Sequence, residues 1–167
     1  MFRNLIFRKL GYNFVVKDDG LRGGKGVRIY NKDNYLDAFD YCKEILKEDD
    51  LDIRNPKKLI IEERLYGEEF VLMSFCDGKN ISHMPIAIDF KDLGKDNNIK
   101  TGGMGSIINK NHSFNFLNTD DIIKSKSLNN LIMDYLSRDD IYGYRGILYG
   151  SFMKTNSGVK LIEYNAR

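Results

Sequence analysis

Short apolar runs that alternate with polar residues recur along the chain and predict β-strands. They stand at residues 13–17, 26–30, 58–63, 69–75, 80–88, 145–153 and 159–164. A hydrophobic period of two is typical of strands that bury one face. Asp77-Gly78, ahead of residues 80–88, favours a type I′ hairpin turn. Residues 92–105 are polar and rich in glycine, so the pattern predicts a loop there.

Two stretches repeat their apolar residues at helical spacing instead. The first has Asp33 or Asn34 as its expected N-cap, and Thr119 is the expected cap of the second. The apolar positions are Tyr35, Ala38, Phe39, Cys42, Ile45 and Leu46 in the first stretch, and Leu128, Leu131, Ile132, Tyr135 and Leu136 in the second. Strands that outnumber the helices and do not alternate regularly with them predict an α+β fold.

A glycine-rich loop follows the strand that ends at Lys17. It contains Gly20, Gly23, Gly24 and Gly26, with Lys25 between the last two. Glycine lets backbone N–H groups approach an anion closely, and the two lysines supply charges suited to phosphate oxygens. The spacing is not that of a Walker loop, and the loop leads into a strand rather than a helix. We expect a flap that closes over a nucleoside triphosphate, and a basic hairpin loop is the alternative.

Two further segments carry polar groups suited to a nucleotide. Glu163 and Asn165 are two apart on the last predicted strand, so they share a face, with Tyr164 on the other. Their oxygens are half of a site for a hard cation such as Mg²⁺, unless they form an ordinary polar strand edge. Backbone groups around Glu63 and Leu65 could pair with an adenine edge, and Glu69 could accept ribose hydroxyls. The alternative is two strands with solvated glutamates.

Composition narrows the classes of function. The net charge of +2 over 167 residues argues against bulk nucleic-acid binding. Residues 1–32 are nevertheless basic, which suits a small polyanion, whereas residues 33–63 are acidic. Cys42 and Cys76 have no metal-type spacing, so we expect reduced core residues in a cytoplasmic protein. Residues 1–9 are too short and too charged for a signal peptide or a membrane span.

Five segments together resemble one family, from about Gly11 to Arg167. They are VVKDDGLRGGKGV at 15–27, IEERLYGEEF at 61–70, TGGMG at 101–105, YRGILYGSFM at 144–153 and LIEYNAR at 161–167. The chain is similar to the ATP-grasp domain of phosphoribosylamine–glycine ligase. The resemblance implies a partial ATP-grasp fold of antiparallel sheets with flanking helices and a phosphate flap. It also implies a nucleotide-binding subdomain at about 13–75 and a metal and substrate subdomain at about 79–167.

The resemblance implies a reaction and its ligands as well. ATP phosphorylates glycine, and 5-phosphoribosylamine attacks the acyl phosphate to give glycinamide ribonucleotide, ADP and phosphate. Such catalysis is mainly positioning and charge neutralisation, so no nucleophilic side chain is required. Mg²⁺ or Mn²⁺ is the implied metal. By resemblance ATP contacts Lys17, Gly23, Gly24, Lys25, Gly26, Glu63, Leu65 and Glu69, the metal contacts Glu163 and Asn165, and the substrates contact Asp89, Lys91, Thr101, Gly102 and Gly103.

The chain departs from the family pattern in its substrate loop and at its ends. Asn98-Ile99-Lys100 replaces the usual Gly-Pro-Asn before Thr101. The family's N-terminal domain and a segment after Arg167 are expected to be missing, so a second chain could carry them. Two alternatives to a complete ligase stay open, a non-catalytic ATP-binding fragment and a vestigial domain that binds nothing.

Overall fold

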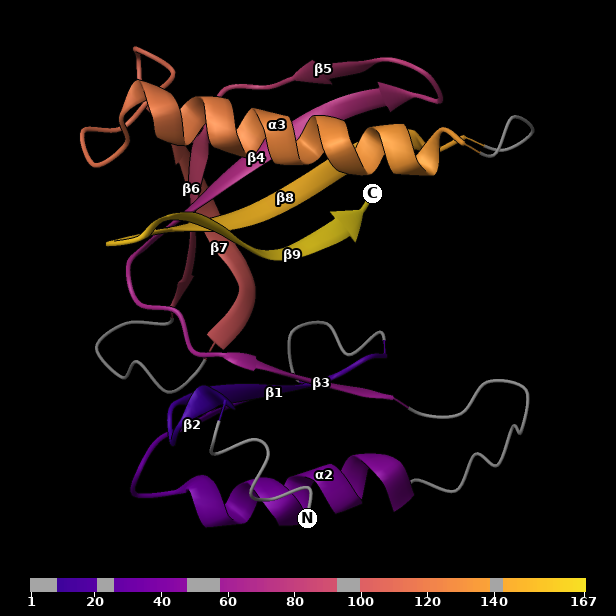
Figure 1. Cartoon of the computed structure of the whole chain (residues 1–167). Helices are drawn as coiled ribbons and strands as arrows, with labels where there is room; N and C mark the ends of the chain where they lie inside the picture. Colours follow the sequence, from indigo (N-terminus) through magenta and orange to yellow (C-terminus); the bar gives the residue numbers. More distant parts are fainter. Residues whose placement is uncertain (1–8, 21–25, 48–57, 93–99, 139–142) are drawn as a thin grey trace. The chain divides into compact units, whose positions relative to one another are not determined.

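The chain divides into two compact units, residues 1–64 and residues 65–167. The structure is a computed structural model that describes residues 9–20, 26–47, 58–92, 100–138 and 143–167, with the backbone alone at residues 47, 91, 92 and 100–103. In each unit one helix packs against one face of an antiparallel sheet (Figure 1). The α+β prediction is therefore confirmed. The division falls before the strand at 68–77, which belongs wholly to the second sheet. The nucleotide-binding subdomain at about 13–75 and the metal and substrate subdomain at about 79–167 stay predictions.

The first unit is a three-stranded sheet in the order β2-β1-β3. Its strands are β1 (Phe14–Asp18), β2 (Val27–Tyr30) and β3 (Leu59–Glu63), and its helices are η1 (Tyr35–Asp37) and α2 (Ala38–Lys47). Phe14 and Val16 alternate toward α2, where they meet the buried Ala38, Tyr41 and Ile45. The intervening Val15 and Lys17 therefore belong to the opposite face of this sheet. This face is called the open face of the first sheet below because it points away from α2.

The first helical segment begins as predicted, but its cap differs in detail. Asn34 is the N-cap residue, yet its side chain makes no capping hydrogen bond to the helix. The Asn34 side-chain oxygen instead accepts from the backbone N–H of Asn31, at 2.7 Å. The side chain stabilises the preceding turn, which is a common alternative use of asparagine.

The second unit is a six-stranded sheet in the order β7-β6-β4-β8-β9, with β5 paired to β4. Its elements are β4 (Glu68–Asp77), β5 (Ile81–His83), β6 (Ala87–Asp92), β7 (Lys100–Ile108), α3 (Thr119–Leu136), β8 (Arg145–Thr155) and β9 (Gly158–Ala166). Helix α3 covers one face, where Phe70, Leu72 and Phe152 are buried (Figure 1). The opposite face of this sheet points away from α3 and is called the open face of the second unit below. No helix in the described ranges is long and apolar enough to cross a membrane.

Helix α3 differs from the prediction in both its cap and its buried face. Asn118, not Thr119, is the N-cap, in a capping box with Asp121. The predicted apolar residues Leu131 and Tyr135 are 66% and 64% exposed. The predicted Leu128 and Ile132 are partly buried against the core, but the fully buried residues of the helix are Asp121, Ser125, Asn129 and Met133. A mostly polar stripe can be buried because tertiary hydrogen bonds satisfy it, such as those from the Asn129 amide to the Leu72 carbonyl and the Ser74 hydroxyl.

Two predicted connections are wrong. The loop expected at 92–105 contains strand β7, which pairs with β6 through Phe90–Gly105 and Asp92–Lys100 with a register shift between them. Its glycines hid the strand pattern, but backbone pairing does not require side chains. The Asp77-Gly78 turn is a hairpin but not type I′. That turn needs positive φ at both central residues, and among described non-glycine residues only His112 has one.

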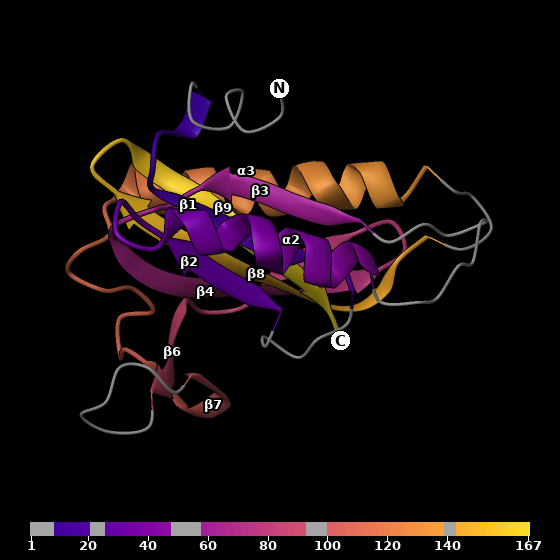
Figure 2. The ribbon, with the colours of Figure 1, turned by 90° about the horizontal axis from the view of Figure 1, so that it is seen from below.

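Strands β6 and β7 form an arm that extends away from the rest of the second sheet (Figure 2). In the described residues β6 pairs with β4 at Ala87–Val71 alone, whereas β7 follows β6 from Ala87 to Asp92. Residues beyond Ala87 are therefore held to the main sheet chiefly through side chains. The arm exposes Phe90, Met104, Ile107 and Ile108.

Candidate functional site

The open face of the first sheet carries a charged pair. The Lys17 ammonium lies 2.5 Å from the Glu62 carboxylate, and their side chains are 13% and 36% exposed. Glu62 lies opposite Val15 on β3, so strand alternation places it on the same face as Lys17. The sequence interpretation included Lys17 but not Glu62, because only the β1–β3 register reveals their proximity.

The glycine-rich loop joins two antiparallel strands, as expected for a flap. Strand β1 pairs with β2 up to Lys17–Val27, and the Asp18 N–H donates to the Gly26 carbonyl at 2.9 Å. Gly26 is buried at the base of this hairpin. Gly23, Gly24 and Lys25 lie outside the described residues, so their predicted phosphate contacts stay predictions.

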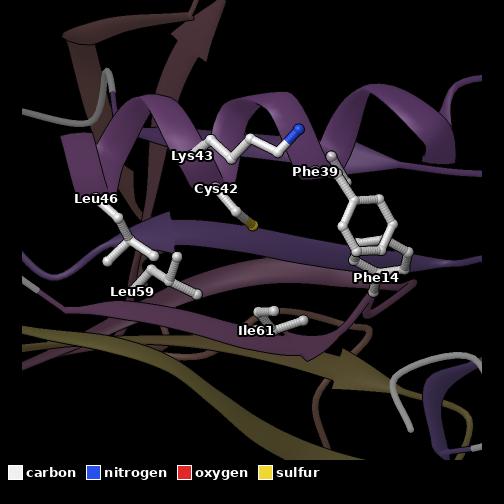
Figure 3. A pocket seen from close by; sticks show the side chains of 8 residues that line it. Phe14, Phe39, Cys42, Lys43, Leu46, Leu59 and Ile61 are labelled. Atoms are coloured by element: carbon white, nitrogen blue, oxygen red, sulfur yellow. The ribbon is translucent and has the colours of Figure 1, made fainter. Parts of the chain in front are cut away.

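An apolar pocket of about 230 Å³ lies on the other side of the same sheet, against α2 (Figure 3). Its lining consists of Phe14, Ala38, Phe39, Cys42, Lys43, Leu46, Leu59 and Ile61. Burial raises the pKa of the Cys42 thiol, which keeps it protonated. The pocket belongs to the core side of the sheet. Among its described lining residues Lys43 alone is charged, and the Lys43 ammonium lies 3.1 Å from the Asp40 carboxylate, so the pocket does not suit a triphosphate.

The predicted adenine and ribose residues are divided between the two units. Glu63 is exposed at the end of β3, opposite Phe14. Leu65 is half-buried in the segment before β4, and Glu69 is exposed on β4 opposite Met153. Glu69 lies two residues from the buried Val71 and therefore on the open face of the second unit.

The predicted metal residues share the open face of the second unit, as strand alternation required. The Asn165 amide donates to the Glu163 carboxylate at 3.1 Å, whereas Tyr164 packs into the core against α3. Glu163 lies opposite Ser151 and Asn165 opposite Tyr149 on β8. The Asn165 N–H₂ points to Glu163, so the amide oxygen is left as an acceptor for a cation.

Tyr149 connects this pair to the predicted substrate residue Asp89. Its hydroxyl donates to the Asp89 carboxylate, and the Arg167 guanidinium lies 5.8 Å from the centre of its ring. Burial, then the hydrogen bond and charge of Asp89, raise the pKa of the Tyr149 phenol well above its ordinary value. The phenol is therefore neutral and a hydrogen-bond donor at neutral pH.

Sequence reasoning missed Tyr149 and Arg167 as members of this face. Alternation along β8 predicts the face on which Tyr149 lies, and alternation along β9 does the same for Arg167. Only the register between the two strands shows that both residues lie near each other on this face. The other substrate candidates lie on the arm. Asp89 is opposite Ser106. Lys91 is on β6, and Thr101, Gly102 and Gly103 are on β7, where the structure describes their backbone alone.

The oxygen atoms of Glu163 and Asn165 suit a hard divalent cation, but two side chains provide few ligands. A carboxylate and an amide oxygen are groups that Mg²⁺ accepts, usually together with water and substrate phosphates. In the described part of the chain, no three His, Cys, Asp or Glu side chains gather as a metal cluster. Glu163 and Asn165 would therefore hold a cation that is shared with another ligand rather than enclosed by protein.

The model of the phosphoribosylglycinamide synthetase ATP-grasp (A) domain matches residues 3–167. The chain belongs to this family. Its ATP-grasp fold was predicted from the five sequence segments and is confirmed.

Two similar curated proteins carry the same name. The phosphoribosylamine–glycine ligase of Methanocorpusculum labreanum is 40% identical over 97% of this chain, and that of Methanobrevibacter smithii is 43% identical over 92%. The alignments cover 36% and 35% of those proteins. The chain thus spans about a third of the length of the curated relatives it matches.

Solved structures support the same fold. A phosphoribosylamine–glycine ligase from Thermotoga maritima has a TM-score of 0.75 and 30% identity, covering 99% of this chain and 40% of that one. An N5-carboxyaminoimidazole synthetase from Staphylococcus aureus, solved with ADP, has a TM-score of 0.65 and covers 99% of this chain and 37% of that one. At 17% identity the second likeness shows the fold alone.

Proposed function

We propose that this chain is the nucleotide- and metal-binding part of a ligase that joins glycine to 5-phosphoribosylamine. A glycine carboxylate oxygen attacks the γ-phosphorus of ATP, and ADP leaves. The amine of 5-phosphoribosylamine then attacks the acyl carbon, phosphate leaves, and the nitrogen loses a proton. The products are glycinamide ribonucleotide, ADP and phosphate. Membership of the family over residues 3–167 is the observation that carries this proposal.

In this proposal some residues would neutralise phosphate charge and others would orient the nucleotide and the substrates. Lys17 and Lys25 would neutralise phosphate oxygens, with backbone N–H groups of Gly23, Gly24 and Gly26 beside them. Glu63 and Leu65 would pair with adenine through their backbone, and Glu69 would accept the ribose hydroxyls. Asp89, Lys91 and residues 101–103 would contact the substrates. Preorganised charges of this kind lower the barrier of phosphoryl transfer without a nucleophilic side chain.

Glu163 and Asn165 would hold Mg²⁺ or Mn²⁺. The bound cation would neutralise charge on the phosphate oxygens. Glu163 and Asn165 lie side by side on the open face of the second unit, which supports this assignment, and the bond between them does not use the Asn165 amide oxygen.

A second candidate function is ATP binding without ligation. The alignments cover only 35–36% of the relatives, so the ligation reaction of the whole relatives remains a proposal for this chain.

The metal assignment is tested with Glu163→Gln combined with Asn165→Ala. We expect the double variant to stay folded and to lose the Mg²⁺-dependent part of ATP binding, measured by calorimetry with and without Mg²⁺. Glu68→Gln with Asn156→Ala makes the same chemical changes at exposed positions of the same unit and should bind as wild type does. Unchanged Mg²⁺-dependent binding in the first double variant would show that the assignment is wrong.

A further inference from the structure

Backbone pairing with the main sheet does not fix the position of Asp89. Strand β6 pairs with β4 at Ala87, and Asp89 lies two residues further along the arm. Its own partner across the ladder is Ser106 of β7, which belongs to the same arm. Backbone pairing therefore holds Asp89 to the arm and not to the strands that carry Glu163 and Asn165.

Tyr149 makes the connection that the backbone does not make. It lies on β8, opposite Met73 of β4 and Asn165 of β9. Strand β4 lies between β6 and β8 in the order of the sheet, so β6 and β8 are not paired with each other. The Tyr149 side chain nevertheless links them, because its hydroxyl donates to the Asp89 carboxylate.

The Tyr149 ring is itself held in place. The Arg167 guanidinium lies 5.8 Å from the ring centre, within the range of a cation–π contact. The Arg167 backbone is fixed in turn, because its N–H and carbonyl both bond to Ile147 at 3.0 Å. A rigid β8–β9 pair thus supports the phenol that contacts the arm.

We propose that Tyr149 is a positioning residue, whose hydroxyl holds the Asp89 carboxylate where it receives the ammonium group of the amino-acid substrate. The inference rests on the proposed function, since an amino acid must bind this face for Asp89 to have that role. A carboxylate is the natural partner of an ammonium group, and a neutral phenol orients it without cancelling its charge. Phenylalanine at this position would keep the ring and lose the orienting bond.

The test uses the whole chain saturated with Mg²⁺ and a non-hydrolysable ATP analogue, titrated with glycine in a calorimeter. We expect Tyr149→Phe to weaken glycine binding about tenfold, within the range for a hydrogen bond to a charged group. Asp89→Asn should weaken it at least as much, and the double variant no more than Asp89→Asn alone. Binding of the Mg²⁺–nucleotide to Tyr149→Phe should stay within about twofold of wild type.

Tyr164→Phe is the matched control. Its hydroxyl is buried and has no hydrogen-bond partner in the described structure, so removing it should leave glycine affinity unchanged. Hydrogen exchange gives a second readout. Amides of the β6–β7 arm should exchange faster in Tyr149→Phe and not in Tyr164→Phe.

The outcomes separate this inference from the proposed function. Wild-type glycine affinity in Tyr149→Phe, or additive losses in the double variant, would overturn the positioning role. Nucleotide binding without glycine binding by the wild-type chain would also overturn it and leave the nucleotide site standing. Failure of the wild-type chain to bind the Mg²⁺–nucleotide would instead contradict the proposed function itself.

Discussion

The ion pair between Asp121 and Lys154 joins the start of α3 to β8 and allows a quantitative prediction. The Lys154 ammonium lies 2.6 Å from the Asp121 carboxylate, and the side chains are 26% and 6% exposed. The other carboxylate oxygen accepts from the Asn118 N–H at 3.0 Å. Burial opposes the charge, but the Lys154 hydrogen bond, the Asn118 hydrogen bond and the Lys154 charge outweigh it and lower the pKa of Asp121.

The two halves of the pair are not equivalent. Lys154→Met leaves a buried carboxylate without its cation, which costs about 3–5 kcal/mol for a fully buried pair. Since Lys154 is partly exposed, screening reduces the expected loss to about 2–3 kcal/mol. Asp121→Asn leaves an ammonium that can turn to water, so its expected cost is smaller, about 1–2 kcal/mol. At about 2–4 °C per kcal/mol, Lys154→Met should lower Tm by about 4–12 °C.

Thermal and urea unfolding of both variants at neutral pH test this order. Lys124→Met replaces an exposed lysine of α3 and should change the stability by less than about 0.5 kcal/mol. A loss in Asp121→Asn that equals or exceeds the loss in Lys154→Met would refute the reasoning.

The pH dependence of the pair has a definite sign. The pKa of Asp121 is lower in the folded state, so its stabilisation is complete above the unfolded pKa of about 3.9 and is lost as pH falls through the folded value. In Lys154→Met uncompensated burial should raise this pKa instead. The stability gap between variant and wild type should therefore narrow as pH falls, and a constant gap would contradict the assignment.

Three further predictions concern other parts of the chain. Burial, partly opposed by the hydrogen bond that the His83 ring Nε2–H donates to the Asn130 side-chain oxygen, lowers the pKa of His83. Its stabilisation should therefore be lost as pH falls from its unfolded pKa of about 6.5. Urea unfolding at pH 7.5 and 5.5 should show this pH dependence in wild type and lose it in His83→Gln. Gly67→Ala should cost about 3 kcal/mol or more, because a Cβ there would lie 1.9 Å from the Lys154 carbonyl oxygen. Gly11→Ala, with positive φ but open space around it, should cost about 1 kcal/mol, and equal losses would contradict the clash. The 167-residue chain alone should release ADP from ATP, glycine and 5-phosphoribosylamine near background, because misplacement of a reacting group by about 1 Å can cost a hundredfold in rate; robust turnover would show that these residues suffice.

The local sequence pattern predicted most strands. The alternation of apolar and polar residues along a strand can be recognised without knowing which strand it pairs with. Residues 13–17 and 159–164 match β1 and β9 closely. Alternation alone also placed Glu163 and Asn165 on one face with Tyr164 on the other. Strand β7 was not predicted, because its glycines leave no hydrophobic pattern in the sequence. The strand forms nevertheless, because its backbone pairs with β6.

Features that depend on tertiary contacts could not be predicted in the same way. The buried side of α3 is polar because the Leu72 carbonyl and Ser74 hydroxyl, more than fifty residues away in sequence, accept from Asn129. The contacts of Lys17 with Glu62 and of Tyr149 with Asp89 depend on strand order and register. These contacts make up much of the candidate site, so sequence identified its charged residues more readily than their partners.

The central claim is that the chain binds ATP together with a divalent cation. Its most direct test is the thermal unfolding of the purified chain with ATP and Mg²⁺ titrated together, and with each alone. At a hundred times its dissociation constant the ligand should add about 2.7 kcal/mol of stability, which corresponds to a Tm increase of about 5–11 °C. We expect this increase with ATP and Mg²⁺ together and a smaller one with ATP alone. Folded chain whose Tm does not change at millimolar Mg²⁺–ATP would contradict the account and favour a vestigial domain.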